Sequence, residues 1–451
     1  MRLLTINGSP AGENSITLQT MRYMEKLYPQ VHYTTIHAAW KIRSLEMDFS
    51  EAEKLLKEAD LIVFCYPVYT FLVPSQLHRF IELIKEKGID LRGKYVTQLS
   101  TSKHFYDTTA HEYIRENCLD LGMRYIRGLS ADMEDLLHEK GQKEAKGFFR
   151  HLLWSVKHAM FECPERGRQE IHGTLHSAKI PEKEHPKAEG KRVVVVTDLE
   201  EGNTRLSTMI ERFRAQLPYQ SDLVNIRTFP FAGGCLGCFH CASDGKCIYK
   251  DHFDDYLREK IQTADATVYA FSVKDHSMGY RFKVYDDRQF CNGHRTVTMG
   301  KPVGYLVDGM LSRESNLKTM LEARAQVGGN LLTHIAGNEG DVDPEIDRLC
   351  AELSFALKQG YTQPANFYGE GGRRIFRDLI YQMQGMMRED HRFYKKHGFY
   401  DFPQKDLGKI LAMYLVGALT SNPKLMQKSG VSMTEGMLMP YKRVIEKAGK
   451  R

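Results

Sequence analysis

Four cysteines lie within thirteen residues of this chain, in the stretch GGCLGCFHCASDGKCIYKD. Cys235, Cys238 and Cys241 are each separated by two residues, and Cys247 follows after a turn that contains a glycine. Three thiolates at this spacing can bind three corners of an iron–sulfur cubane, which a fourth thiolate completes. Zinc more often takes two C-x-x-C pairs joined by a longer loop, so the spacing favours a [4Fe–4S] cluster over zinc. A reduced loop that binds no metal is the other alternative.

The remaining five cysteines are scattered: Cys65, Cys118, Cys163, Cys291 and Cys350. Cys65 lies in an apolar run, where we expect a small core residue. The chain begins directly with a strand-like run rather than with a secretion signal. This start predicts a cytoplasmic protein, in which thiols stay reduced and a cysteine cluster indicates metal or redox chemistry.

A second set of polar residues follows three apolar runs in the first part of the chain. The segment NGSPAGENSITLQ supplies the hydroxyl groups of Ser9, Ser15 and Thr17 between a predicted strand and a predicted helix. Backbone N–H groups and the positive end of a helix dipole lie at such a turn, and together with the hydroxyls they suit a phosphate monoester.

Two further turns follow later strands of the same part. The segment YPVYTF contains Pro67, Val68 and Tyr69, and the segment STSKHFYD contains Thr101, Ser102 and His104. Parallel strands end at one edge of their sheet, where open α/β sheets bind ligands. We therefore expect all three turns to border one site.

The elements that position these turns alternate between strand and helix. Apolar runs at 2–8, 59–67 and 94–101 alternate with amphipathic segments at 15–28, 74–88 and 108–122. This pattern predicts a parallel sheet with helices on both faces. It starts again at residue 191, and the pair Ala59-Asp60 recurs 205 positions later as Ala264-Asp265. The sequence therefore predicts a duplicated α/β unit.

The predicted domains follow from this repeat and from composition. We expect a first α/β domain at 1–160, a linker rich in Lys, Glu and Pro at 161–190, a second such domain at 191–365 and a helical extension at 366–451. The fold class is therefore α/β, with two tandem doubly wound parallel sheets. Nothing in the extension suggests chemistry, and we expect it to pack on the second domain or to form a contact in a homo-oligomer.

Composition and charge exclude several classes of protein. The 451 residues are 42% hydrophobic and 27% charged, with a net charge of +6, which is typical of a globular protein. Basic residues alternate with acidic ones, so we expect no nucleic-acid surface. The longest apolar run, ILAMYLVGAL, is too short to cross a bilayer, so we expect a core helix and no membrane association.

The three turns together resemble those of the flavodoxin-like, NAD(P)H-dependent FMN reductase family. The resemblance covers residues 1–135 and 191–340, and the cysteine spacing is similar to that of iron–sulfur flavoproteins within it. It implies that the first loop holds the FMN phosphate and that the other two turns border the flavin ring. The residues so implicated are Ser9, Ser15, Thr17, Pro67, Val68, Tyr69, Thr101, Ser102 and His104. The family usually has a basic residue in the phosphate loop, where this chain has Ala11.

The second domain departs further from that pattern. Its first loop, TDLEEGNTRL, carries Asp198, Glu200 and Glu201, whose carboxylates would repel a phosphate. Its ring turn, SVKDHSMGYRF, lacks the Pro-x-Tyr motif, and we interpret His276 there as a surface turn residue. The second domain is therefore expected to have lost flavin while keeping the cysteines.

Together these features predict an oxidoreductase that takes electrons from NAD(P)H, binds FMN and a [4Fe–4S] cluster, and reduces a small-molecule acceptor or a redox protein. The flavin ring would carry the chemistry, so no catalytic side chain is named. An electron-carrier module for a partner enzyme is one alternative. A non-catalytic assembly protein with degenerate flavodoxin-like domains is another.

Overall fold

The apolar runs of the first half form a parallel sheet in the computed structural model, which describes residues 1–162, 174–182 and 184–420. Its strand order is β2-β1-β3-β4-β5, and β6 pairs with β4. The strands are β1 (Arg2–Asn7), β2 (His32–Ile36), β3 (Leu61–Pro67), β4 (Tyr95–Ser102), β5 (Arg124–Tyr125) and β6 (Leu129–Asp132). The central strands are buried on both faces because helices cover both sides of the sheet.

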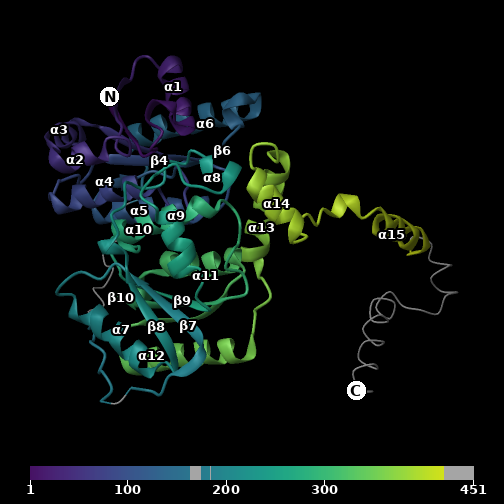
Figure 1. The fold of residues 1–451 in the computed structure, drawn as a ribbon. Coiled ribbons are helices and arrows are strands. Elements are labelled where there is room, and N and C mark those ends of the chain that lie inside the picture. Colours follow the sequence, from purple (N-terminus) through teal and green to yellow (C-terminus); the bar gives the residue numbers. More distant parts are fainter. Residues whose placement is uncertain (163–173, 183, 421–451) are drawn as a thin grey trace. The chain divides into compact units, whose positions relative to one another are not determined.

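The first five helices of this half lie between its strands along the chain, and the sixth follows the last strand (Figure 1). They are α1 (Ile16–Leu27), α2 (Ile42–Met47), α3 (Ser50–Glu58), α4 (Ser75–Glu86), α5 (Asp107–Asp120) and α6 (Glu139–Lys157). The helix α1 begins at Ser15, whose side chain accepts a hydrogen bond from the Leu18 N–H and so caps the first turn. The first loop lies between the end of β1 at Asn7 and this cap at Ser15. It is therefore held at the edge of the sheet.

The second half repeats this architecture. Its sheet has the order β8-β7-β9-β10-β11, again all parallel. The strands are β7 (Ala188–Thr197), β8 (Tyr219–Asn225), β9 (Ala266–Ser272), β10 (Pro302–Asp308) and β11 (Leu331–Gly337). The helices are α7 (Thr204–Gln216), α8 (His240–Asp244), α9 (Phe253–Tyr256), α10 (Gly279–Arg288), α11 (Ser315–Gly328) and α12 (Val342–Gln359). Both sheets have the 2-1-3-4-5 order of flavodoxin-like folds, so the predicted fold class is confirmed.

The duplication extends to single hydrogen bonds. At the turn after β3, Tyr69 and Leu72 exchange two backbone hydrogen bonds, and Lys274 and Ser277 do the same after β9. The two residues inside each turn have left-handed backbone conformations, at 70–71 in the first half and 275–276 in the second. The spacing between the turns is the 205 residues of the sequence repeat. The turn geometry is therefore retained where the Pro-x-Tyr motif is absent.

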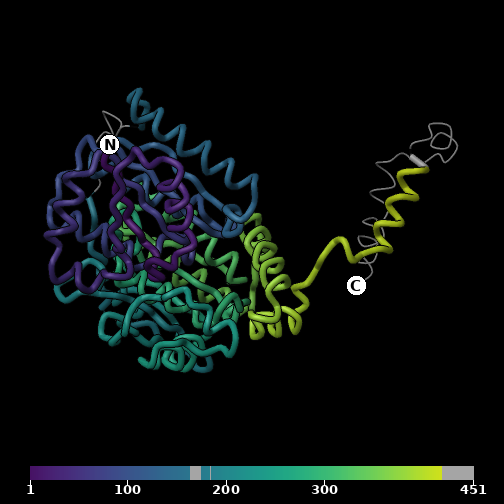
Figure 2. Tube along the Cα trace, turned by 90° about the horizontal axis from the view of Figure 1, so that it is seen from above, coloured from purple at the N-terminus to yellow at the C-terminus, as the bar shows by residue number. Residues whose placement is uncertain are grey.

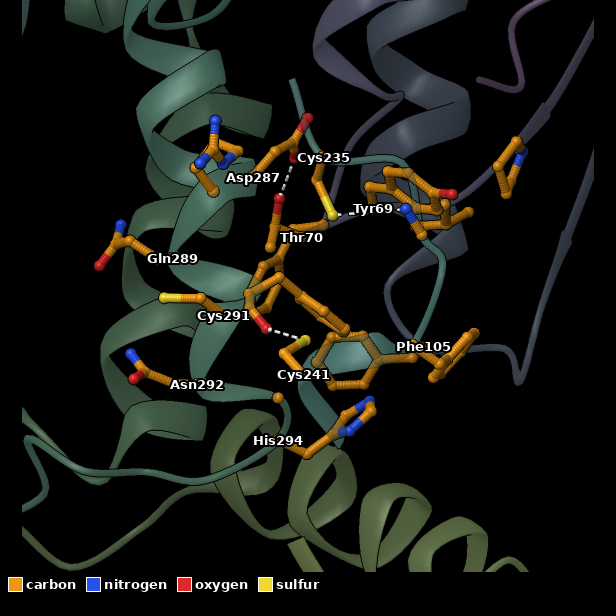
Figure 3. Close-up of a pocket in the computed structure, with 18 of the residues that line it drawn as sticks. Tyr69, Thr70, Phe105, Cys235, Cys241, Asp287, Gln289, Cys291, Asn292 and His294 are labelled. Carbon is orange, nitrogen blue, oxygen red and sulfur yellow. Dashed lines mark hydrogen bonds between the residues drawn. The ribbon is translucent and has the colours of Figure 1, made fainter. Parts of the chain in front are cut away.

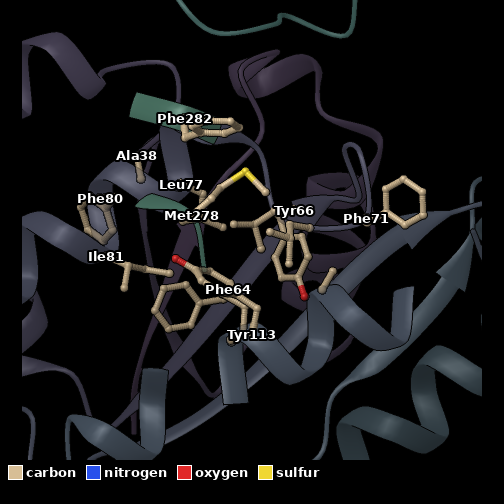
Figure 4. Packing of buried hydrophobic residues seen from close by; sticks show 14 of the residues in the cluster. Ala38, Phe64, Tyr66, Phe71, Leu77, Phe80, Ile81, Tyr113, Met278 and Phe282 are labelled. Carbon is tan, nitrogen blue, oxygen red and sulfur yellow. The ribbon is translucent and has the colours of Figure 1, made fainter. Parts of the chain in front are cut away.

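Equivalent helices of the two halves pack against one another. The helix α4 packs on α10, and α5 packs on α11, as in the isologous interface of a symmetric dimer. Apolar side chains of both halves share one core there, among them Leu77, Phe80, Met278 and Phe282 (Figure 4). The buried Glu82 accepts hydrogen bonds from Lys274 Nζ at 3.0 Å and from the Tyr280 N–H at 2.7 Å. The chain therefore contains an internal pseudo-dimer.

The pseudo-dimer lies in a compact unit at 1–393, which Figure 2 traces, and a second unit comprises 394–451. The last helices are α13 (Phe367–Gln382), α14 (Arg388–Lys396) and α15 (Leu407–Thr420). Residues 163–173 and 183 of the predicted linker, and 421–451 of the predicted extension, lie outside the described residues. Among the helices that are described, none has both the length and the apolar character needed to cross a bilayer.

Candidate functional site

A cavity of about 550 Å³ lies at the carboxyl edge of the first sheet (Figure 3). Three segments of the first half line it: the first loop (residues 9–17) and the two ring turns (67–71 and 101–105). The cysteine loop (residues 235–247) of the second half lines it as well. Its volume lies within the range of small-molecule and cofactor sites. The two chemistries that the sequence assigns to separate domains therefore share one site.

Three hydroxyl groups of the first loop line this cavity, and one of them, Thr17 Oγ1, shares a hydrogen bond of 2.5 Å with Thr101 Oγ1. Ser9 Oγ accepts a hydrogen bond from the Ala11 N–H, and Ser15 Oγ accepts one from the Leu18 N–H, each at 3.3 Å. A hydroxyl that accepts from the backbone can still donate its own proton. Ser9, Ser15 and Thr17 all line the cavity, and the amino terminus of α1 adds positive potential. This donor set fits a phosphate monoester.

The turn after β3 forms a second wall of the cavity. Pro67, Val68 and Tyr69 line it, together with Thr101 and Ser102 from the end of β4. The Val68 N–H donates to the Thr101 carbonyl oxygen at 3.3 Å, which joins the two turns. Main-chain groups and an aromatic ring are thus presented along one edge, as a planar ring system requires.

Residues 70 and 71 of this turn are strained, with φ angles of +41° and +72°. A buried ion pair of the second half, Lys283 and Asp287, holds them in place. Asp287 Oδ1 accepts a hydrogen bond from Thr70 Oγ1 at 2.6 Å, and Lys283 Nζ donates to the Tyr69 carbonyl at 3.0 Å. Burial raises the pKa of Asp287. Nothing in the sequence points to these two residues, because the contact joins positions more than 200 residues apart.

His104 takes a different position from its neighbours. Lys103 and Phe105 line the cavity, whereas the His104 side chain is exposed and its Nδ1 lies 2.9 Å from Asp107 Oδ2. Its left-handed φ of +56° turns the side chain away from the edge of the sheet. Of the nine predicted flavin-site residues, eight line the cavity and His104 does not.

All four cysteines of the cysteine loop line the cavity, with Cys238 exposed and the other three partly buried. The Gly237 N–H donates to Cys235 Sγ at 3.4 Å, and Cys241 donates its S–H to the Phe290 carbonyl at 3.1 Å. Burial raises the pKa of Cys235 strongly and that of Cys241 to about 12. Both are therefore thiols in the metal-free protein, and metal binding would release their protons.

This sulfur set fits an iron–sulfur cluster. Four thiols line one cavity, and a peptide N–H donates to one of the sulfur atoms, an interaction that tunes cluster potentials. A fifth thiol, the buried Cys291, lines the same cavity. The sequence contains no signal for Cys291, because it lies 44 residues beyond Cys247 and outside any recognisable spacing.

Buried charges hold the cysteine loop at both ends. Arg288 forms two hydrogen bonds to the Asp251 carboxylate, at 2.8 and 2.7 Å, and donates to the Gly233 carbonyl at 2.9 Å. Its guanidinium also stacks over the Tyr249 ring, 4.5 Å from the centroid. Because Gly233 precedes the first cysteine and Asp251 follows the last, one side chain fixes the width of the loop.

The ring turn and the cysteine loop are in direct contact. The Tyr69 hydroxyl donates to the Leu236 carbonyl at 3.4 Å, and Gln76 Nε2 donates to the Cys235 carbonyl at 3.2 Å. Gly237 has a φ of +62°, and a Cβ there would overlap the Tyr69 hydroxyl. Glycine at 237 therefore allows the loop to approach the turn this closely.

The corresponding edge of the second sheet is filled by charged side chains. Asp308, at the end of β10, accepts hydrogen bonds from Arg205 at 2.9 Å, Asn338 at 2.7 Å and Ser272 at 3.0 Å. Burial also raises the pKa of Asp198, in the first loop of this half, to about 7. These carboxylates oppose phosphate binding at this edge.

His276 lies in the seam between the halves. Its Nε2 is 2.8 Å from Asp120 Oδ2 and its Nδ1 is 3.1 Å from Glu314 Oε2. Burial opposes the charged ring, but the hydrogen bonds to these two carboxylates outweigh it and raise the pKa of His276 to about 10. The side chain therefore joins the halves as a cation, rather than occupying an exposed turn.

Comparison with known proteins agrees with the resemblance read from the turns. Residues 1–134 match the family model of NADPH-dependent FMN reductases. An iron–sulfur flavoprotein of Archaeoglobus fulgidus is 25% identical over 178 residues, which cover 37% of this chain and 79% of that protein. A ribosyldihydronicotinamide dehydrogenase (quinone) of Pongo abelii is 37% identical over 134 residues, 29% of this chain and 48% of that protein, so the chain spans about half its length.

Two solved structures are also similar to part of the chain. An NADPH-quinone reductase from P. pentosaceus has 16% identity and a TM-score of 0.27, over 36% of this chain and 98% of that one. An FMN-dependent NADH-azoreductase from Bacillus anthracis has 15% identity and a TM-score of 0.27, over 35% and 98%. The chain is thus a duplicated flavodoxin-like protein whose first 134 residues match the NADPH-dependent FMN reductases.

Proposed function

We propose that this chain is an NAD(P)H-dependent flavin oxidoreductase with one FMN site and one [4Fe–4S] site in a shared cavity. One observation carries the proposal: phosphate-binding hydroxyls, ring-binding turns and four cysteines line the same space. The family model that matches residues 1–134 supports the flavin part. The iron–sulfur flavoprotein relative supports the cluster part.

In this proposal the chain binds and orients rather than supplying a reacting group. Ser9, Ser15 and Thr17 would hold the phosphate of FMN, and the turns at 67–69 and 101–102 would border its ring. FMN, when bound, supplies hydride transfer from NAD(P)H and release of electrons to an acceptor. The ion pair Lys283–Asp287 keeps the strained turn in its binding conformation.

The four cysteines would hold the cluster beside the same turn. Cys235, Cys238, Cys241 and Cys247 are the ligands, and Arg288 sets the distance between the ends of their loop. A [4Fe–4S] cluster, when bound, supplies one-electron transfer. The hydrogen bond from Tyr69 to the Leu236 carbonyl joins the two segments that would hold these groups.

The first test is an absorption spectrum of protein purified without oxygen, with FMN, iron and acid-labile sulfide quantified. We expect one FMN and about four irons per chain. Rapid reduction of the bound flavin by NADH or NADPH would establish the electron donor. A colourless protein that takes up no FMN would refute the proposal and favour the assembly-protein alternative.

The substitution Cys241→Ser separates the two cofactors. It removes a ligand, so we expect the iron content to fall by more than half while the FMN content stays unchanged. Cys350→Ser is the matched control, because Cys350 is buried in the second half and donates its S–H to the Phe213 carbonyl. Equal iron in the wild type and in Cys241→Ser would show that the cysteine loop is not the cluster site.

Exposure of Cys238 favours a second candidate, transfer of single electrons to a redox protein. A cluster ligand at the surface would let a partner approach within transfer distance. Stopped-flow reduction distinguishes the two functions. The carrier function requires fast reduction by a ferredoxin and slow reduction by NAD(P)H, whereas the enzyme requires the opposite.

A further inference from the structure

An aromatic wall (Phe71, Phe105, Phe290, His294 and Phe376) runs along one side of the cavity. Phe71 and Phe105 belong to the two ring turns of the first half, with centroids 5.1 Å apart. The Phe376 ring, on α13, lies 4.2 Å from Phe105 and 4.4 Å from His294. His294 and Phe290 come from the second half and are 5.1 Å apart. Phe376 is therefore the link that makes the wall continuous.

The helix α13 is pressed closely against the first half. The Tyr106 hydroxyl donates to the Tyr368 carbonyl at 2.7 Å. Gly372 lies where a Cβ would press against Phe105 and Val327, so glycine allows the helix to approach. Close contact along a full turn of the helix fixes the direction in which Phe376 projects.

A buried carboxylate fixes the chain that follows this helix. Asp390 is fully buried and accepts hydrogen bonds from the His294 N–H at 3.1 Å and from Arg295 Nη1 at 2.9 Å. The oxygen that accepts from the His294 N–H, Asp390 Oδ2, also lies 3.0 Å from His294 Nδ1. A buried charge with this many partners is costly to displace. The helix is thus anchored at both ends and forms a fixed wall of the cavity.

We propose that Phe376 is the specificity-determining residue for the electron acceptor, and that it limits the number of fused rings that can lie beside the flavin. This inference rests on the proposed function. Planar aromatic compounds pack well on aromatic side chains, and the cavity of about 550 Å³ leaves limited room once a cofactor fills part of it. The ring of Phe376 borders that room, in contact with the rings of Phe105 and His294.

The test compares kcat/KM for duroquinone, which has one ring, with that for 9,10-phenanthrenequinone, which has three fused rings. Phe376→Ala enlarges the cavity, so we expect the ratio of three-ring to one-ring kcat/KM to rise about tenfold or more. Phe376→Trp narrows it, so the ratio should fall. Comparing ratios between variants removes the difference in reduction potential between the two quinones.

Phe367→Ala is the matched control, because Phe367 lies on the same helix with 85% of its surface exposed and should leave the ratio unchanged. The FMN content of each variant shows that it has folded. An unchanged ratio in both Phe376 variants, with FMN bound, would overturn the inference.

A second readout separates this inference from the proposed function. Binding of oxidised 9,10-phenanthrenequinone without NAD(P)H can be followed by flavin fluorescence in the wild type and in Phe376→Ala. We expect about tenfold tighter binding in the variant. Absence of NAD(P)H turnover in the wild type would refute the proposed function alone, whereas equal dissociation constants would refute the role of Phe376.

Discussion

In the proposed function, the hydroxyl groups of the first loop hold the phosphate of FMN. The nearest lysine side chain of the cavity lining is Lys103, and it is already paired with Asp132 at 2.9 Å. The first loop itself, NGSPAGENSIT, contains no lysine or arginine. Phosphate affinity therefore depends on neutral donors, which give a hydrogen bond but no net charge. Arg22 is already paired with Glu13 of this loop at 2.9 Å, so a further negative charge there would repel the phosphate.

Ser15→Asp places such a charge at the cap of α1. It can still cap the helix, but Coulomb repulsion should weaken FMN binding by at least about tenfold. Isothermal titration of the apoprotein with FMN measures the change. Ser50→Asp, at the exposed start of α3, is the control and should bind FMN as the wild type does. Wild-type affinity in Ser15→Asp would move the phosphate site elsewhere.

Part of the site could be predicted residue by residue and part could not. Eight of the nine residues predicted from the three turns line the cavity, since each turn follows a strand of one parallel sheet. His104 differs because one left-handed residue reverses the direction of a side chain, and periodicity does not reveal it. Cys291 and Phe376 reach the cavity only through packing between distant segments, for which a single sequence has no signal.

At the scale of elements, the turn after β3 depends on the opposite half. Two consecutive residues with positive φ cost roughly 1–3 kcal/mol each. The ion pair Lys283–Asp287 offsets this cost through hydrogen bonds to Thr70 and to the Tyr69 carbonyl. The helix α10 thus acts as a support for a loop of the other half.

Asp287→Asn should therefore affect both stability and ligand binding. It removes the nearer of the two carboxylates beside the fully buried Lys283 and leaves only Asp286 Oδ2, at 3.7 Å, so we expect the free energy of unfolding to fall by about 3 kcal/mol. Urea unfolding monitored by circular dichroism measures this loss, and FMN titration of the folded variant should show weaker binding. Asp90→Asn, which disrupts an exposed pair with Arg92, should change neither quantity noticeably. Wild-type stability in Asp287→Asn would exclude the supporting role.

The order of the elements was predictable, whereas their packing was not. Continuous apolar runs alternating with amphipathic helices require a parallel sheet, and the 205-residue repeat requires a second one. The sequence does not reveal that α4 packs on α10 and α5 on α11, since the apolar side chains that form this interface look the same as core residues. The extension was expected to carry no chemistry, and α13 lies against the cavity because one glycine, Gly372, allows it.

At the scale of the whole molecule, the seam between the halves carries buried charge. His276 lies between Asp120 and Glu314, and Lys85 pairs with Asp275 beside it. The pKa of His276 is raised to about 10 from 6.5. A raised pKa means that the charged ring stabilises the folded state fully below pH 6.5, and that this contribution is lost as the pH rises toward 10.

His276→Gln removes that contribution. The thermal stability of the wild type should fall more steeply between pH 6.5 and pH 10 than that of the variant. The reason is that unfolding of the wild type releases the His276 proton in this range, and the variant has no such proton to release. Differential scanning calorimetry across this range measures both slopes. His32→Gln, on the exposed end of β2, is the control and should keep the wild-type slope. Parallel slopes for wild type and His276→Gln would contradict the charged state of the ring.

The difference between the two sheet edges predicts how many FMN molecules each chain binds. Asp308 and its partners fill the second edge, so we expect one FMN per chain at saturation. Equilibrium dialysis against excess FMN, with protein measured by amino-acid analysis, gives the ratio. A ratio near two would show that the second edge opens and binds flavin despite its carboxylates.

Joining two equivalent halves in one polypeptide has a consequence for how such a protein can change. In a homodimer each substitution is copied into both active sites, so a cysteine loop gained by one site is gained by the other. Here the halves packed through α4 and α10 mutate independently. One half can therefore keep a loop suited to phosphate, while the other half carries carboxylates at the equivalent position and contributes cysteines to the cavity of the first half. The two equivalent sites of a fused chain can therefore acquire different functions, whereas those of a symmetric homodimer cannot.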